Sequence, residues 1–434
     1  MNVVLAKTET GRVVDSIFTV SRDRLPGTAN VGETRRQAFE AYERAGLPHR
    51  RVEEWKYTDL RVLLREVKPL AAKPDASALK RAKAALKPIA IDGASKLVLV
   101  DGVFVPDLSD AAPAGLAIRS LQEALDGGTS DLLESGIKDA MISLNAALAT
   151  DGFVAAIADG TQLAKPLQII HVATASSASS FTRSLLRIGA GARVTLVENF
   201  VAAEGATAYQ THDAVLLAVG DAAELTHVRL MADGVDAANV SSAIFSVGAK
   251  AKFNLFNLTA GGALSRYQGF VTLAGEGSEL IANGVNLLSG TQHGDTTLVV
   301  DHAVPNCISR EIFRAVVDDR AHSVFQGRII VRPDAQKTDG KMMTRALLLS
   351  DEAEADNKPE LEIFADDVTC GHGATSGALD ESLLFYLRAR GLPEKDAQAL
   401  LIQAFVGEAV EGIANDDLRD AVTATAQRWL ETRS

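Results

Sequence analysis

The chain has 434 residues, of which 47% are hydrophobic, 5% aromatic and 23% charged, and its formal net charge is −12. This length allows a large core and more than one structural unit. The acidic balance argues against a nucleic-acid partner, because nucleic-acid binding needs clustered lysine and arginine. No apolar run approaches the roughly 18 residues of a membrane span. The start, MNVVLAKTETGRVV, lacks the pattern of a secretory signal.

The cysteine content indicates the compartment. Only Cys307 and Cys370 are present, which is too few for a disulfide framework in a chain of this length. We therefore expect a cytoplasmic protein with reduced thiols and no membrane contact.

Residues 1–95 predict an N-terminal helical domain. The segment TRRQAFEAYERAGLP ends with Gly46 and Pro48, which is a stop signal for a helix. A second helical pattern follows in DASALKRAKAALKPI. Between them, EEWKYTDL would place Trp55 and Tyr57 on one face if it were extended, either as a core anchor or as a docking element.

Residues 96–378 predict a mainly β core, in which a repeat is clearest from about residue 165. The repeated phrase is an apolar residue, a glycine, a small or acidic pair and a new strand. Its glycines, at steps of 31, 28 and 27 residues, are Gly189, Gly220, Gly248 and Gly275. The segments after Val317 and Leu349 are interpreted as degenerate later copies.

Such a regular phrase favours a stacked β-solenoid, in which each turn buries its apolar positions on the next and small residues form the corners. We therefore predict a parallel β-helix. A β-sandwich remains the alternative on this pattern alone.

Residues 379–434 predict a C-terminal helical domain. Asp380 is a good N-cap for its first helix, and a glycine ends that helix. The apolar stripes of the first two helices contain Leu384, Phe385, Leu387, Leu401 and Phe405. These stripes could be intramolecular core or a partner-binding groove. A third helix would turn inward the side chains of Leu418, Val422 and Trp429.

The motif TCGHGAT lies just before these helices and places Cys370 two residues from His372. On a strand the two side chains would share a face. Thiolate and imidazole are both ligands of transition metals, but two ligands make an incomplete metal site. A nucleophile–base pair and a packed cysteine beside a turn histidine are the other interpretations.

Other candidate motifs are incomplete. The gaps between His293, His302, Cys307 and His322 match no compact zinc spacing. The segment TDGKMMT lacks the flanking residues of a phosphate-binding loop, and no G-x-G-x-x-G follows a strand. We therefore expect no nucleotide to be bound by this chain.

Three blocks carry a resemblance to a known family. They are RRVEEWKYTDL at 50–60, VFQGRIIVRPDAQKTDGKM at 324–342 and NKPELEIFADDVTCGHGATSGALDESLLFYLRARGL at 357–392. Together they resemble the SufB/SufD family of the SUF iron–sulfur cluster assembly system over essentially the whole chain. The tryptophan block and the C-x-H-G-A-T form point to its SufD branch.

The resemblance implies a right-handed parallel β-helix flanked by helical N- and C-terminal domains. It also implies a non-catalytic scaffold that pairs with SufB and docks the ATPase SufC, with a homodimer when alone. SufC would bind the C-terminal helices through the residues of their apolar stripes. His372, with Cys370 beside it, would help to hold a nascent iron–sulfur cluster shared with SufB. The alternatives are a carbohydrate-active β-helix enzyme and a purely structural dimer stabiliser.

Overall fold

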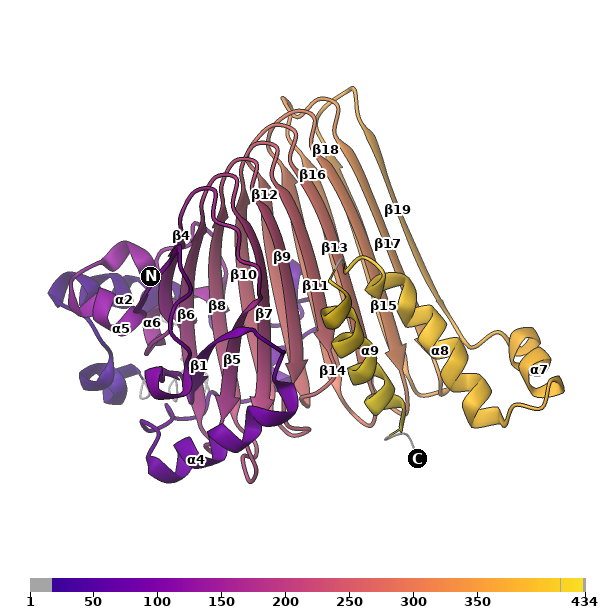
Figure 1. Ribbon diagram of the computed structural model, residues 1–434, viewed down its shortest axis with the longest axis horizontal. Helices are drawn as coiled ribbons and strands as arrows, with labels where there is room; N and C mark the ends of the chain where they lie inside the picture. The colour runs from indigo at the N-terminus through magenta and orange to yellow at the C-terminus, as the bar shows by residue number, and fades with distance from the viewer. Residues whose placement is uncertain (1–17, 414, 432–434) are drawn as a thin grey trace, which may run out of the picture.

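The computed structural model describes residues 18–413 and 415–431, so the start that is expected to lack a secretory signal lies outside the described residues. The chain folds as a parallel β-helix of about eight turns with helices at both ends (Figure 1). Each turn gives one strand to each of two sheets, and neighbours within a sheet come from successive turns. A hairpin-connected sandwich would instead pair consecutive strands. The predicted parallel β-helix is therefore confirmed.

The larger sheet holds the odd-numbered strands from β5 onward together with β1 and β2. Within the described residues it has ten strands in the order β19-β17-β15-β13-β11-β9-β7-β5-β1-β2, and only the β1–β2 pair is antiparallel. Its strands are β1 (Ser95–Val100), β2 (Val103–Phe104), β5 (Leu167–Ala173), β7 (Arg193–Ala202), β9 (Glu224–Ala232), β11 (Lys252–Thr259), β13 (Glu279–Leu288), β15 (Ile308–Val317), β17 (Asp339–Leu348) and β19 (Thr369–Gly377).

The smaller sheet has nine strands within the described residues, in the order β18-β16-β14-β12-β10-β8-β6-β4-β3. They are β3 (Leu116–Ser120), β4 (Phe153–Ile157), β6 (Ser179–Ile188), β8 (Gln210–Val219), β10 (Ala238–Val247), β12 (Leu264–Leu273), β14 (His293–His302), β16 (His322–Val331) and β18 (Glu354–Ile363). Ile188, Val219 and Val247 stand at equivalent places in successive turns and are all buried. Each such side chain contributes roughly 1.5–3 kcal/mol through burial.

The repeated glycines lie at the corners where the chain passes from the smaller sheet to the larger. These corners follow β6, β8, β10 and β12, and each rests on the corner before it. A Cβ atom on Gly220 would lie 2.7 Å from the backbone nitrogen of Ala190, and one on Gly275 would lie 1.8 Å from that of Ala249. Only glycine allows this close approach of two backbones. The glycine repeat is therefore confirmed as one corner per turn.

The interpretation of the two later segments as copies of this corner is wrong. The segments after Val317 and Leu349 connect β15 to β16 and β17 to β18. They lie at the opposite corner, where the chain passes from the larger sheet to the smaller. The true equivalents, at 303–307 and 332–338, contain no glycine. The stacking continues there, but the glycine signal does not.

Helices cover the N-terminal end of the β-helix. They are α2 (Ala29–Ala45), α3 (Leu60–Leu63), α4 (Ala76–Ala85), α5 (Leu121–Asp126) and α6 (Ala140–Leu148). α6 packs between α2 and strands β6 and β8. Asp139 caps α6 by accepting hydrogen bonds from the backbone N–H groups of Met141 and Ile142. None of the helices in the described part of the chain is long and apolar enough to cross a membrane.

Trp55 joins this N-terminal layer to the β-helix. It ends a short 3-10 helix (Glu53–Trp55) instead of lying in an extended segment with Tyr57, and it is 1% exposed. Its indole N–H donates a hydrogen bond of 2.9 Å to Asp139 Oδ2, and the guanidinium of Arg266 lies 3.9 Å from the ring centroid. Trp55 is therefore a core anchor, as one of the two interpretations predicted, and offers no docking surface.

Three helices follow the last strand: α7 (Glu381–Ala389), α8 (Glu394–Val410) and α9 (Asp416–Glu431). Figure 1 shows α8 and α9 against the larger sheet and α7 projecting beyond β19. The inward orientation predicted for Leu418, Val422 and Trp429 is confirmed, because all three are buried and belong to a core cluster shared with strands β13 and β15.

Candidate functional site

Cys370 and His372 lie on β19, the final strand of the larger sheet. Residues two apart on a strand share a face, and Cys370 packs against the core that fills the lumen of the β-helix. His372 pairs in register with Met342, which belongs to the same core and is 2% exposed. Both candidate ligands therefore lie on the lumen face of the last turn.

The end of the β-helix is open at this turn. Most residues of β18 and β19 are exposed or half-buried, whereas the earlier strands are mostly buried, because no further turn covers β18 and β19 (Figure 1). His372 is consequently exposed although it lies on the lumen face, and Cys370 is half-buried.

The environment distinguishes the two side chains as ligands. Burial raises the pKa of the Cys370 thiol, with Asp339 and Glu311 adding to the rise. A thiol must lose its proton to bind a metal, whereas a neutral imidazole binds directly. His372 is therefore the readier ligand. Within the described residues, no third histidine, cysteine or carboxylate joins these two in a three-ligand group, so the pair by itself does not complete a metal site.

The side chains of the predicted docking stripe fall into two groups. On α7, Phe385 is 74% exposed, while Leu384 and Leu387 are half-buried. On α8, Leu401 and Phe405 are both half-buried, and Phe405 packs against the core cluster beneath α8. The buried face of α8 consists of Ala397, Ile402, Val406, Ala409 and Val410. The structure thus leaves the α7 part of the stripe open and uses Phe405 partly for intramolecular packing.

The four scattered residues with no zinc spacing do not form a site. His302 Nε2 pairs with Ser309 Oγ at 2.9 Å, and Cys307 Sγ lies 3.3 Å from Ser278 Oγ. The rings of His293 and His322 meet edge to face 4.8 Å apart, but no group of three metal-ligand side chains includes them within the described residues. These contacts give the four residues packing and hydrogen-bonding roles within the β-helix.

Sequence reasoning missed one group of metal-ligand side chains, which lies deep in the lumen. It consists of His171, Glu198 and Asp213, from strands β5, β7 and β8. Their separations of 27 and 15 residues match no local metal motif. The available signal was the turn length, since residues about one turn apart along the chain come close together in a solenoid.

Comparison with known proteins places the chain in a family. Residues 18–169 match the SufBD protein N-terminal region, and residues 171–405 match the SUF system FeS cluster assembly SufBD core domain. The iron–sulfur cluster assembly protein SufD of Escherichia coli is 32% identical over 88% of this chain and 89% of its own length. A SufBD family protein of Synechocystis is 30% identical over 85% and 84%, and SufD of Bacillus subtilis is 26% identical over 74% and 78%. Because the match to the core domain covers more than half of this chain, the chain belongs to the SufBD family of the SUF iron–sulfur cluster assembly system.

Proposed function

We propose that the chain is a non-catalytic scaffold subunit of the SUF complex, on which a nascent iron–sulfur cluster forms between this chain and SufB. The observation that carries the proposal is the exposed, incomplete ligand pair Cys370 and His372 on the last strand. Iron–sulfur clusters are held by about four donors. A partner that covers the open end of the β-helix would supply the others.

The open end also offers backbone groups to a partner. β18 and β19 stand at the ends of their sheets and each has a strand neighbour on one side only, within the described residues. Such edges present free N–H and C=O groups that can pair with a strand of another chain. SufB would bind here in the complex. The same edges would allow two copies of this chain to form a homodimer when SufB is absent.

Helix α7 carries the proposed contact with SufC. Phe385, Tyr386 and Leu383 are 74%, 52% and 51% exposed, so large apolar side chains face outward over much of this short helix. Large exposed apolar side chains on one short helix suit a contact with another protein. SufC would supply nucleotide hydrolysis, and this chain would bind no nucleotide. The two free cysteines suit the reducing cytoplasm in which we place the complex.

The proposal is tested by co-expressing the chain with SufB and SufC and measuring iron and sulfide per purified complex under anaerobic conditions. His372→Ala should leave the complex assembled and lower its cluster content at least roughly ten-fold, because alanine offers no ligand atom. His49→Ala is the matched control, since His49 is a partly exposed histidine near the other end of the chain. It should leave the cluster content unchanged.

Two results would contradict the proposal. Full cluster content in the His372→Ala complex would reduce this chain to a structural stabiliser of the dimer. Dissociation of the complex by the same substitution would give His372 a packing role in place of a ligand role.

A further inference from the structure

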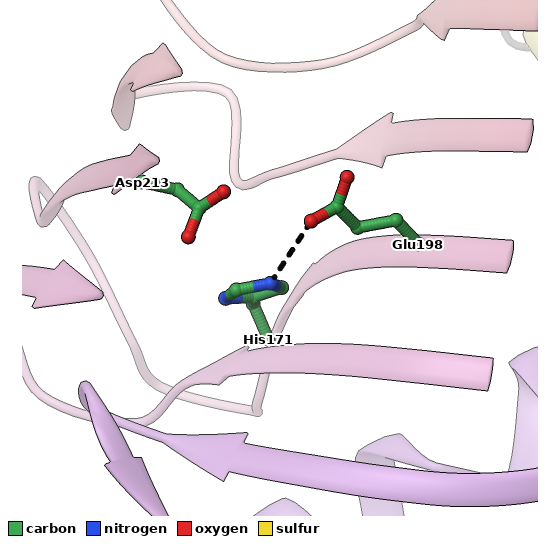
Figure 2. A group of neighbouring side chains, drawn as sticks. All are labelled: His171, Glu198 and Asp213. Atoms are coloured by element: carbon green, nitrogen blue, oxygen red, sulfur yellow. Dashed lines mark ion pairs between the residues drawn. The ribbon is translucent and has the colours of Figure 1, made fainter. Parts of the chain in front are cut away.

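The lumen of the β-helix contains a second, fully buried group of metal-ligand side chains. Figure 2 shows His171, Glu198 and Asp213 converging on one space from three strands. One ligand atom of each lies within 4.8 Å of the other two. The three residues are 6%, 2% and 4% exposed, so solvent does not reach the space between them.

A second imidazole, that of His227 on β9, contacts the other oxygen of the same carboxylate. His171 Nε2 lies 3.4 Å from Glu198 Oε1, and His227 Nε2 lies 3.3 Å from Glu198 Oε2. Hydrogen bonds between nitrogen and oxygen are usually about 2.7–3.2 Å long. Neither ring nitrogen, nor Glu198 Oε1, has a hydrogen-bond partner among the described residues.

These separations suit a shared metal ion. Two ligands bound tetrahedrally at about 2.1 Å from an ion stand roughly 3.4 Å from each other. The separation of 3.4 Å between His171 Nε2 and Glu198 Oε1 agrees with that value. Asp213 accepts one hydrogen bond, from Thr182 Oγ1 to its Oδ1 at 2.5 Å, which leaves Oδ2 available to an ion.

The charges around the group also call for a cation. The nearby guanidinium of Arg229 donates to Asn257 Oδ1 at 3.0 Å, to Asn239 Oδ1 at 3.1 Å and to Ser241 Oγ at 3.0 Å. Burial raises the pKa of Asp213, and the positive charge of Arg229 partly offsets this rise from a distance. Among the described residues, however, the guanidinium makes no hydrogen bond or ion pair with Glu198 or Asp213. A buried carboxylate without a counter-charge costs several kcal/mol. One divalent ion would neutralise both carboxylates.

The alternative to a metal ion is a proton on His171, which would also place a positive charge beside the carboxylates. Burial alone would lower the pKa of this imidazole, but Asp213 and Glu198 outweigh burial and raise it. An imidazolium there would face Glu198 Oε1 at 3.4 Å, which is longer than an ordinary hydrogen bond between nitrogen and oxygen.

We propose that His171, Glu198 and Asp213 bind one divalent transition-metal ion, such as zinc or ferrous iron, as a permanent structural centre, while His227 contacts the second oxygen of Glu198. A mixed set of imidazole and carboxylate donors suits ions of this class. The ion would join β5 and β7 of the larger sheet to β8 of the smaller one. Because the site is sealed, the ion enters as the chain folds. This inference does not depend on the proposed function of the exposed pair.

The test is the metal content of the folded full-length chain after dialysis against EDTA, measured by mass spectrometry. We expect about one equivalent of ion that resists the chelator in the folded state and is released when the chain is unfolded. The double variant Cys370→Ala/His372→Ala should retain it. The isosteric variants Glu198→Gln and Asp213→Asn should lose most of it.

His302→Gln is the matched control, because His302 is a fully buried lumen histidine outside the group. It should keep the ion. Less than about 0.1 equivalent in the wild-type chain, from cells supplied with zinc, iron and manganese, would overturn the proposal in favour of the protonated network, whether or not the variants fold. Retention of the ion by Glu198→Gln, or its loss from the Cys370/His372 double variant, would also overturn it.

Discussion

The two groups of metal-ligand side chains differ in the number of their donors and in their exposure to solvent. The group around Glu198 offers three donors within 4.8 Å of one another but is sealed inside the lumen. Cys370 and His372 lie at the open end, but two donors do not complete a metal site. Cys370 and His372 stand on the larger sheet, as do His171 and Glu198, whereas Asp213 stands on the smaller sheet. The difference arises from the stack, because inner turns are covered on both sides and the last turn on one side only. The proposed permanent ion would therefore lie in the covered interior of the stack, and the proposed temporary site at its open end.

The largest effect is expected from the sealed group. Glu198→Ala should lower the free energy of unfolding by about 3–5 kcal/mol, because it leaves two buried imidazoles without their carboxylate. Denaturant unfolding at neutral pH measures this loss. The matched control is Glu224→Ala, which removes the exposed ion pair with Arg193 and should cost about 0–1 kcal/mol. Equal losses for the two variants would show that water reaches the inner lumen.

Glu311 tests how far the dry lumen extends towards the open end. It is 1% exposed, and burial raises its pKa from 4.5 to about 8. Between these values the folded chain keeps a proton that the unfolded chain has lost, so stability from this group is full below pH 4.5 and falls as pH rises towards 8. The loss amounts to about 3–5 kcal/mol.

Unfolding curves collected from pH 5 to 8 for the wild type and Glu311→Gln measure this contribution. The glutamine variant should lack the dependence and be relatively more stable at pH 8. If the two profiles are parallel, the hydrated region reaches inward from β19 at least as far as β15.

A smaller effect is expected on the accessible side, at α7. Phe385→Asp should weaken SufC binding by roughly 1.5–3 kcal/mol, about 10- to 150-fold, because it removes a large apolar contact. Titration calorimetry measures the affinity, and the melting temperature should not change because the side chain is 74% exposed. Val235→Asp is the control, since Val235 is 80% exposed on the distant connection between β9 and β10. Unchanged affinity in Phe385→Asp would remove α7 from the interface.

The smallest effect on stability is expected at the open pair. His372→Ala should cost about 0–1 kcal/mol, and Cys370→Ala about 1 kcal/mol because the thiol is half-buried. Thermal unfolding of the isolated chain measures both costs. In the complex the order should reverse, with His372→Ala lowering cluster content more than Cys370→Ala. A stability loss for His372→Ala as large as that for Glu198→Ala would mean that the end is not open.

Much of the fold could be predicted from the sequence because a solenoid repeats its local requirements. The glycine corners recur wherever one backbone must approach another, as Gly220 and Gly275 do. The prediction failed after residue 300, where the corresponding corners contain no glycine. The glycine pattern reports only the close approach of two backbones, so it cannot identify corners that are built without glycine.

The two metal-ligand groups were not equally visible in the sequence. Cys370 and His372 are neighbours in the chain, so strand alternation alone places them on one face. Glu198 meets His171 and His227 only because the turns are 29–31 residues long and the strands stack in a fixed register. Ile169 and Arg229, not the histidines, stand directly beside Glu198 in that register. The diagonal contact depends on side-chain direction, which the sequence does not reveal.

The one-sided cover of the last turn also determines when it can form. β19 pairs only with β17 within its sheet, so it cannot become ordered before the turn beneath it. Turns of a solenoid are stabilised chiefly by their neighbours, and the final turn has one neighbour where the others have two. Amide hydrogen exchange should therefore be faster in β19 than in β13. The face that carries His372 would be the last part of the β-helix to assemble, and a chain that presents it has already completed the stack below.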